Sequence, residues 1–172
     1  MAVAREYEKC ALVMGILSSC EERRSELFNE LEKHFGKILI VSKTMDFSFT
    51  DYYDKEMGGR PVRYLLLFEN TVDPSSLADI KTATNTLEMQ FLGSSGRQMN
   101  IDPGLLSLSS FILATCKDRS HRIPLKNGIY AETTLIYQDR DFQTLPWTYA
   151  DYASDEVRAV LREFRTIYKS NK

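Results

Sequence analysis

Apolar residues fall into short runs and stripes that predict alternating strands and helices. Residues 11–17 form a continuous apolar run, which is typical of a strand buried on both faces. A stripe at helical spacing follows and is made of Leu27, Phe28, Leu31 and Phe35. We expect Ser19 to begin this helix in a capping box with Glu22, and Gly36 to end it.

Two more strands and a second helix are expected in the middle of the chain. Residues 37–49 predict a second strand and residues 62–68 a third, because apolar and polar side chains alternate there. The pair Asp73-Pro74 is a strong helix start, with a capping acid before a proline. The buried stripe of this helix is Leu77, Ile80, Thr84, Leu87 and Phe91. Residues 93–96 would then form a flexible loop.

The last third of the chain predicts a hairpin and a final helix. Residues 98–101 suit a short fourth strand closed by a turn at residues 102–104, while residues 105–115 suit either a helix or a strand. Asn127-Gly128 is a favoured tight turn between residues 121–125 and 129–137. Residues 138–150 are expected to be a loop, and Ser154 to begin the last helix.

This order of elements indicates an α+β fold in one domain, residues 1–172. The sheet is expected to be mixed or antiparallel, with packed helices. A ferredoxin-like β-α-β-β-α-β core followed by a hairpin and a helix fits the order. The competing arrangement is a mixed sheet with helices on one or both faces.

Composition excludes some classes of function. The chain has 172 residues, 43% of them hydrophobic and 27% charged, as in an ordinary soluble domain. Its net charge of -2 argues against a nucleic-acid partner, which would need a basic face. No run approaches the ~20 apolar residues of a membrane helix, so no membrane partner is expected.

The cysteines and the first apolar run favour the cytoplasm. The chain has three cysteines without a Cys-x-x-Cys pair, so we expect reduced thiols and no metal site. Residues 17–20, Leu-Ser-Ser-Cys, resemble a lipoprotein cleavage box. The apolar run before them is short for a signal peptide, and a buried strand followed by a helix cap explains these residues better.

Ionisable residues are unusually dense between residues 100 and 132. His121 is a candidate acid or base near neutral pH, and Lys117 and Arg122 are candidate clamps for a phosphate or carboxylate. Asp102 and Glu132 belong to the same segment. The alternative is a solvated, charged turn. Adjacent strand residues point to opposite faces, so convergence of His121 and Arg122 requires residues 117–122 to be a loop, with the strand starting near Ile123.

Two further segments carry candidate groups. Asp46 and Asp51 could polarise a water or hold Mg²⁺, and the alternative is a strand end with a polar outer face. Trp147, the single tryptophan, and Tyr149 lie in a segment that could cover a pocket, stack a base or bind a protein partner. The alternative is a loop whose rings hold it on the core.

Several segments together resemble a known family. These are FSFTDYYDKEMG, VDPSSLADIKTATNTLE, NIDPGLLSLSSFILATCKD, HRI, GIYAETTLIY and LPWTYADY, in this order. The chain is similar over residues 11–168 to the prokaryotic family of domains of unknown function numbered 4416. The resemblance implies no activity. Members are often labelled GTP-binding proteins, but this chain has no phosphate loop, and we expect no guanine nucleotide to bind through one.

The chain departs from the family pattern at three positions. Leu105 stands where the family usually has an aromatic residue, Cys116 where it often has Thr, and Ala150 where it often has Pro. The departure at Cys116 argues against a thiol mechanism common to the family.

The leading hypothesis is a cytoplasmic protein that binds a small anionic ligand, such as a nucleotide or phosphorylated metabolite, with or without catalysis. The candidate catalytic residues are His121, Glu132 and Asp51. The candidate ligand contacts are Lys117, Arg122, Asp102, Trp147 and Tyr149. The alternative is a non-catalytic interaction module that uses the aromatic loop around Trp147. The cofactor and the oligomeric state are not determined by the sequence.

Overall fold

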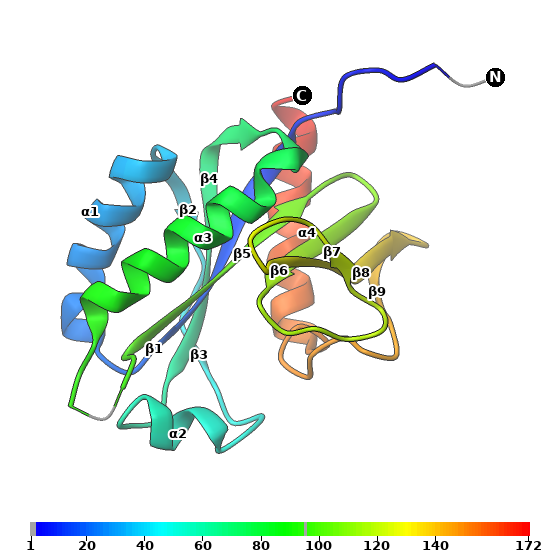
Figure 1. The fold of residues 1–172 in the computed structure, drawn as a ribbon. Helices are drawn as coiled ribbons and strands as arrows, with labels where there is room; N and C mark the ends of the chain where they lie inside the picture. Colours follow the sequence, from blue (N-terminus) through cyan, green and yellow to red (C-terminus); the bar gives the residue numbers. More distant parts are fainter. Residues whose placement is uncertain (1–2, 95) are drawn as a thin grey trace.

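One antiparallel sheet, with helices packed on both of its faces, organises the chain (Figure 1). The computed structural model describes residues 3–94 and 96–172. In these residues the main path of the sheet is β2-β4-β1-β5-β6-β8-β7, with β3 on β4 and β9 on β8. The strands are β1 Cys10–Ser18, β2 Ile38–Val41, β3 Met45–Asp46, β4 Val62–Val72, β5 Met99–Leu106, β6 Ser110–Thr115, β7 Ile123–Pro124, β8 Tyr130–Gln138 and β9 Asp141–Thr144. The α-helices are α1 Arg24–Phe35, α2 Tyr52–Glu56, α3 Leu77–Glu88 and α4 Asp155–Ser170.

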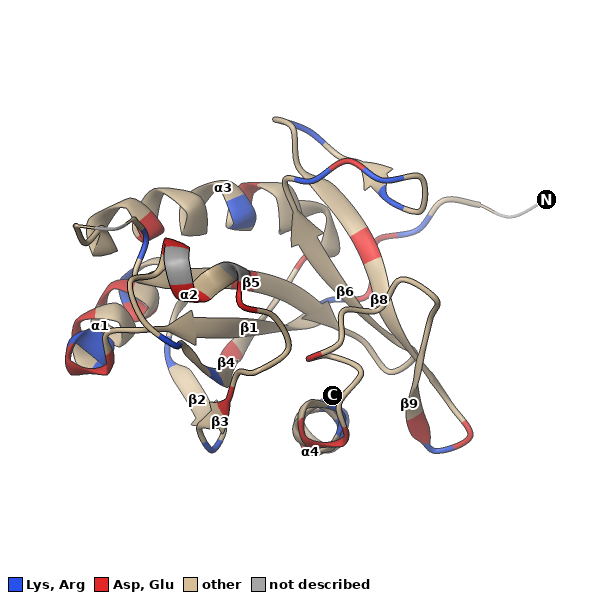
Figure 2. Ribbon diagram, turned by 90° about the horizontal axis from the view of Figure 1, so that it is seen from below, with Lys and Arg blue, Asp and Glu red and all other residues tan. Residues whose placement is uncertain are grey.

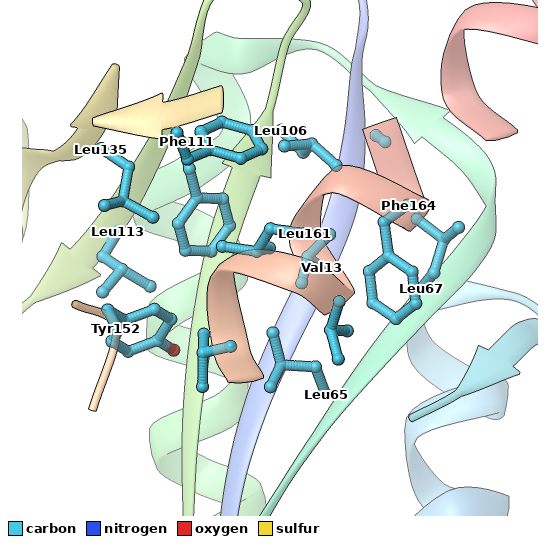
Figure 3. Close-up of a cluster of buried hydrophobic side chains, with 14 of the residues drawn as sticks. Val13, Leu65, Leu67, Leu106, Phe111, Leu113, Leu135, Tyr152, Leu161 and Phe164 are labelled. Carbon is cyan, nitrogen blue, oxygen red and sulfur yellow. The ribbon is translucent and has the colours of Figure 1, made fainter. Parts of the chain in front are cut away.

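The two faces of the sheet carry separate cores. Seen from below, α3 and α4 lie on opposite sides of the sheet (Figure 2). On one face α1 and α3 pack against β1 and β4 through residues such as Leu27, Ile80 and Tyr64. On the other face α4 packs against the sheet through Leu161 and Phe164, beside the labelled Val13, Leu65 and Phe111 (Figure 3). The predicted α+β class with packed helices is therefore confirmed. The ferredoxin-like core stays a prediction.

Helix boundaries mostly follow the expected caps. The Asp73 carboxylate accepts a hydrogen bond from the Ser75 N–H (2.8 Å), ahead of α3. The Ser154 hydroxyl accepts one from the Val157 N–H (3.3 Å) at the start of α4. Gly36 ends α1 with a φ of 86°. The cap predicted at Ser19 is wrong, because its hydroxyl instead donates to the Met57 carbonyl (2.6 Å).

Two predictions about strands were wrong in instructive ways. The strand expected at residues 37–49 is divided into β2 and β3, which both pair with β4. Between them the Ser42 side chain accepts a hydrogen bond from the Leu65 N–H (2.9 Å) and interrupts the ladder. The turn expected at residues 102–104 is absent, because β5 runs through it from Met99 to Leu106.

Pro103 is compatible with a strand because of where its nitrogen points. The N–H and C=O groups of Ile101 bond to side chains on α3 and so point away from β1. Pro103 shares this parity, so its missing N–H falls on the side where β5 has no strand partner. Gly104 is required on structural grounds, because a Cβ there would lie 2.5 Å from the Phe111 ring.

The remaining segments are strands and tight turns. Residues 105–115, left open between helix and strand, are the end of β5 and all of β6. The hairpin at Asn127-Gly128 is confirmed, with positive φ at both residues and β7 paired to β8. The loop expected at residues 138–150 is wrong in part, because β9 forms a further hairpin whose turn residues Asp139 and Arg140 have φ of 52° and 64°. The loop expected at residues 93–96 includes Ser95, which lies outside the described residues.

The sheet opens between β5 and β6. These strands pair only from Gly104 to Leu106 with Phe111 to Leu113, whereas β1 pairs with β5 from Met99 onward. Beyond the paired residues, β6 and β8 turn away from β1 and β5 (Figure 2). Residues 99–103 of β5 therefore have no strand partner on the β6 side. In the described part of the chain, no helix is long and apolar enough to cross a membrane.

Candidate functional site

A cavity of about 490 Å³ lies where the sheet opens. Its floor and sides come from β4, β5, β6, β8 and α3. Aromatic rings from two loop regions complete its walls: Phe47, Phe49 and Tyr53 near α2, and Tyr149 and Tyr152 before α4. The charged residues that line it are Arg63, Lys81, Arg97, Lys117, Asp102, Glu132 and Asp151. This size and this mixture of aromatic and polar groups are typical of a small-molecule site.

Two buried side chains of α3 satisfy the unpaired edge of β5. The Ile101 N–H donates to Glu88 Oε1 (2.8 Å), and Lys81 Nζ donates to the Ile101 carbonyl (2.7 Å). Lys81 is 5% exposed and Glu88 2% exposed. Burial raises the pKa of Glu88, and Lys81, the Ile101 N–H and Arg97 oppose that rise. An ion pair on a helix thus satisfies the backbone groups of Ile101, where β5 has no strand partner.

Arg63 and two carboxylates form the floor. Arg63 pairs with Asp151 through Nη2, and its Nη1 lies 3.7 Å from Asp102 Oδ2. Asp102 also accepts from Asn100 Nδ2 (2.8 Å), and its other oxygen lies 3.6 Å from Lys81 Nζ. The side chain of Arg63 is only 5% exposed, whereas that of Asp102 is 26% exposed. Asp102 is therefore a floor acceptor that a ligand can reach.

Three buried donors at the floor lack acceptors. Within the described residues, Arg63 Nε, Arg63 Nη1 and the Tyr152 hydroxyl have no hydrogen-bond partner. Burial raises the pKa of Tyr152 and so keeps its hydroxyl protonated, while Arg63 lowers it only in part. The side chains fit here because residue 15 is glycine: a Cβ would lie 2.7 Å from Arg63 Nη1 and 2.2 Å from the Tyr152 hydroxyl. Buried donors without partners are costly, so this cluster requires an explanation.

Glu132 organises a second cluster at the side of the cavity. Its side chain is fully buried and accepts from Arg122 Nε (2.6 Å), with His121 Nε2 at 3.0 Å. Arg122 also donates to the Lys117 carbonyl (2.7 Å) and to the Tyr149 hydroxyl (2.5 Å). The donor nitrogens of Arg122 thus all bind protein groups. The predicted loop at residues 117–122 and the strand start at Ile123 are confirmed, but His121 and Arg122 converge on Glu132.

Trp147 packs against the Glu132 cluster through His121. Its ring stacks on His121, with centroids 4.8 Å apart and an interplanar angle of 12°. The indole N–H donates to the Thr133 carbonyl (2.8 Å), and the residue is 37% exposed. The Thr148 hydroxyl donates to the Thr134 carbonyl (2.6 Å), so the loop is fixed to β8. The aromatic segment therefore lies against the sheet.

The cavity gathers four of the eight candidate catalytic and ligand-contact residues. Asp102, Lys117, Glu132 and Tyr149 line it. His121, Arg122 and Trp147 belong to the Glu132 cluster but are not among the lining residues. Asp51 is exposed and directly precedes α2. It does not line the cavity, although Thr50 before it and Tyr53 in α2 do. Asp46 is exposed on β3.

Sequence reasoning missed the two buried cations. Arg63 alternates with Leu65 and Leu67, which puts a charge on an apolar face of β4. Lys81 lies four residues after Leu77 on the buried side of α3. A charged residue at a core position was therefore the available signal in both cases.

The rim of the cavity carries the cations Lys117 and Arg97, and Arg97 is paired with carboxylates. Lys117 is exposed, and Arg97, with a side chain 32% exposed, pairs with Glu56 (2.8 Å) and Glu88 (2.5 Å). Cys116 is exposed at the same rim, and its sulfur accepts from Asn85 Nδ2 (3.4 Å). Among the residues that the structure describes, no three His, Cys, Asp or Glu side chains group as a metal site would require.

The fold and the cavity define an α+β protein with a ligand-sized opening in its sheet. Residues 8–168 match the family model described as Domain of unknown function (DUF4416). The chain belongs to this family. Comparison with curated proteins gives no match, and neither does comparison with solved structures.

Proposed function

We propose that the protein binds a small anionic ligand, a nucleotide or another phosphorylated metabolite, in the cavity between β5 and β6. The observation that carries this is the convergence of four cations from separate segments of the chain on one cavity: Arg63, Lys81, Arg97 and Lys117. Three carboxylates line it as well: Glu132 pairs with Arg122, and Asp151 and Asp102 lie against Arg63. Lys81 and Arg97 pair with Glu88, so the exposed Lys117 is the cation most open to a ligand. Cationic side chains held on rigid elements are the usual means of binding phosphates.

The cavity also suits such a ligand in size and in its walls. Its volume of about 490 Å³ falls within the range of small-molecule sites. Aromatic walls bury the apolar parts of a ligand, while the exposed Lys117 at the rim supports the binding of charge without a large desolvation cost. The expected location is the prokaryotic cytoplasm, which the three free cysteines support.

Catalysis would need more than the binding site, because two of the candidate catalytic residues, His121 and Asp51, do not line the cavity. The His121–Glu132 hydrogen bond has the form of a base and the group that orients it. Because His121 does not line the cavity, a ligand would have to reach it by a shift of the loop that holds Trp147. Asp51 would need a similar approach from the start of α2.

Calorimetric titration with ribose 5-phosphate, pyrophosphate and the four ribonucleoside 5′-monophosphates tests the proposal. We expect at least one to bind, and Lys117→Ala to weaken its binding roughly tenfold to a hundredfold, the worth of one charge-assisted hydrogen bond. Lys126→Ala is the matched control, since Lys126 forms an exposed pair with Asp79 and does not line the cavity. Absence of heat from every probe at millimolar concentration would contradict the proposal.

The alternative function is a protein-interaction module around Trp147. It is supported by exposed apolar side chains in this region of the sheet, including Ile123 at 64% and Ile136 at 39%. Against it, Trp147 is already stacked on His121 and bonded to Thr133. We therefore prefer the ligand-binding function.

A further inference from the structure

The floor and the rim of the cavity differ in charge and in hydrogen-bonding groups. From this difference, and resting on the proposed function, we infer that the ligand is a nucleoside phosphate. Its base enters the floor against Arg63, Tyr152 and Asp102, and its phosphate remains at the rim beside Lys117 and Arg97.

The floor offers donors that lack acceptors. In the described chain Arg63 Nε and Nη1 and the Tyr152 hydroxyl have no hydrogen-bond partner, and Arg63 is 4% and Tyr152 2% exposed. Both side chains lie within 2.7 Å of the point that a Cβ on residue 15 would occupy. The donors are therefore close together, as a ring nitrogen or a ring carbonyl requires.

The floor also offers an acceptor, which decides against a phosphate there. Asp102 is the most exposed of the floor carboxylates, with 26% of its side chain accessible, and Asp151 pairs with Arg63 beside it. A phosphate at the floor would bring negative charge and acceptor oxygens against Asp102 and Asp151. Arg63 and Lys81 already balance the charges of these carboxylates, so they would not balance a phosphate as well. The edge of a nucleobase presents N–H donors beside acceptors and matches this set of groups without adding charge.

The walls are aromatic on both sides of the opening. Phe47 contacts Phe49 and Tyr53 edge-on, with ring centroids 5.6 Å and 5.7 Å apart. Tyr149 and Tyr152 come from the loop on the other side. Rings of this kind stack the faces of a base whatever its identity.

The rim supplies the phosphate contacts. Lys117 is exposed there. Arg97 has 32% of its side chain accessible, but its three side-chain nitrogens donate to Glu56 and Glu88, so Lys117 is the main phosphate contact and Arg97 adds positive charge beside it. Charge at the rim stays in contact with water, so a phosphate binds there at a lower desolvation cost than at the buried floor.

Calorimetry with the four ribonucleoside 5′-monophosphates, the four free ribonucleosides and ribose 5-phosphate tests the inference. At least one monophosphate should bind tenfold or more tightly than ribose 5-phosphate, which lacks the base. If ribose 5-phosphate binds equally well, the inference fails while the proposed function stands. If no phosphate compound binds, both fail. If the free nucleosides bind as tightly as the monophosphates, the phosphate contacts at the rim are wrong.

Two variants test the floor and the walls separately. Asp102→Asn should weaken binding of the monophosphate roughly tenfold to a hundredfold, because it removes the charge and replaces one acceptor oxygen with an N–H donor, and it should leave binding of ribose 5-phosphate unchanged. Phe49→Ala serves if Asp102→Asn does not fold, because Phe49 is 46% exposed and its ring lines the cavity. Phe49→Ala should lower the affinity for the monophosphate about fivefold or more, because stacking is lost. The control Leu39→Ala, at an exposed site on β2 outside the cavity, should leave the affinity unchanged. Equal weakening of ribose 5-phosphate by Phe49→Ala would overturn the inference.

Discussion

Replacement of Lys81 by Met tests whether a buried helix residue substitutes for a missing strand. Lys81 Nζ donates to the Ile101 carbonyl (2.7 Å) and lies 3.8 Å from Glu88 and 3.6 Å from Asp102. Its side chain is 6% exposed. Methionine keeps most of the apolar stem and removes the charge and the donor, so the variant isolates the polar role.

The magnitude follows from what the substitution leaves behind. The Ile101 carbonyl loses its donor, which costs about 1–3 kcal/mol for a buried group. Glu88 and Asp102 lose a nearby cation, and breaking a buried pair from one side costs about 3–5 kcal/mol. The two costs overlap, so we expect a loss of roughly 3–5 kcal/mol in the free energy of unfolding. For a chain of this size that lowers the melting temperature by roughly 6–20 °C.

The assay is urea unfolding followed by circular dichroism, with Lys126→Met as the control. Lys126 also forms a lysine–carboxylate pair, with Asp79 at 2.7 Å, but both side chains are more than half exposed. The control variant should lose at most about 1 kcal/mol in the free energy of unfolding. The double variant Lys81→Met with Glu88→Gln should lose less than the sum of the single variants, because the unpaired carboxylate is gone. A loss for Lys81→Met no larger than for Lys126→Met would refute the reasoning.

Three further predictions concern residues in and around the cavity. Arg122→Ala should lower the free energy of unfolding by about 3–5 kcal/mol, measured in urea, because it leaves the fully buried Glu132 without its arginine; an unchanged stability would return Arg122 to the ligand contacts. Burial raises the pKa of Glu88 above its ordinary value of 4.5, so the stability it contributes is greatest below about pH 4.5 and is lost as the pH rises through the folded-state pKa. Unfolding of Glu88→Gln between pH 3.5 and 7 should lack that decline, and an identical pH profile would argue against it. Gly15→Ala should destabilise the protein by about 1–3 kcal/mol, since its Cβ would lie 2.2 Å from the Tyr152 hydroxyl; an unchanged melting temperature would show that Tyr152 can move aside.

The periodicity of apolar residues and the residues at helix starts and turns predicted most of the helices and strands, because helix caps and tight turns depend on local sequence. Asp73 and Ser154 cap their helices as expected, and Asn127-Gly128 adopts the positive φ values that the pair favours. The failures came where tertiary pairing overrides local preference. Residues 102–104 have the composition of a turn, yet β1 holds them in a strand. Asp139 and Arg140 turn a hairpin without glycine, so no local signal marked β9.

The candidate site was predicted in part for a related reason. Asp102, Lys117, Glu132 and Tyr149 could be found because they lie in segments rich in charged or aromatic residues. Arg63 and Lys81 were missed, since each is a single charge within an apolar element and that isolated charge was the only local signal. Only the opening of the sheet between β5 and β6 gives these two residues a cavity to line. That opening depends on where two strands stop pairing, which local sequence does not encode.

Protection of Cys116 from alkylation tests most directly whether the cavity is the binding site. Cys116 is exposed at the rim, whereas Cys10 and Cys20 are buried. The rate of its reaction with iodoacetamide, followed by peptide mass spectrometry, should fall as a ribonucleoside 5′-monophosphate is added. The fall should saturate at the dissociation constant found by calorimetry, and Lys117→Ala should shift it to higher concentration. A ligand that binds by calorimetry and leaves the rate at Cys116 unchanged would locate binding elsewhere and contradict the account.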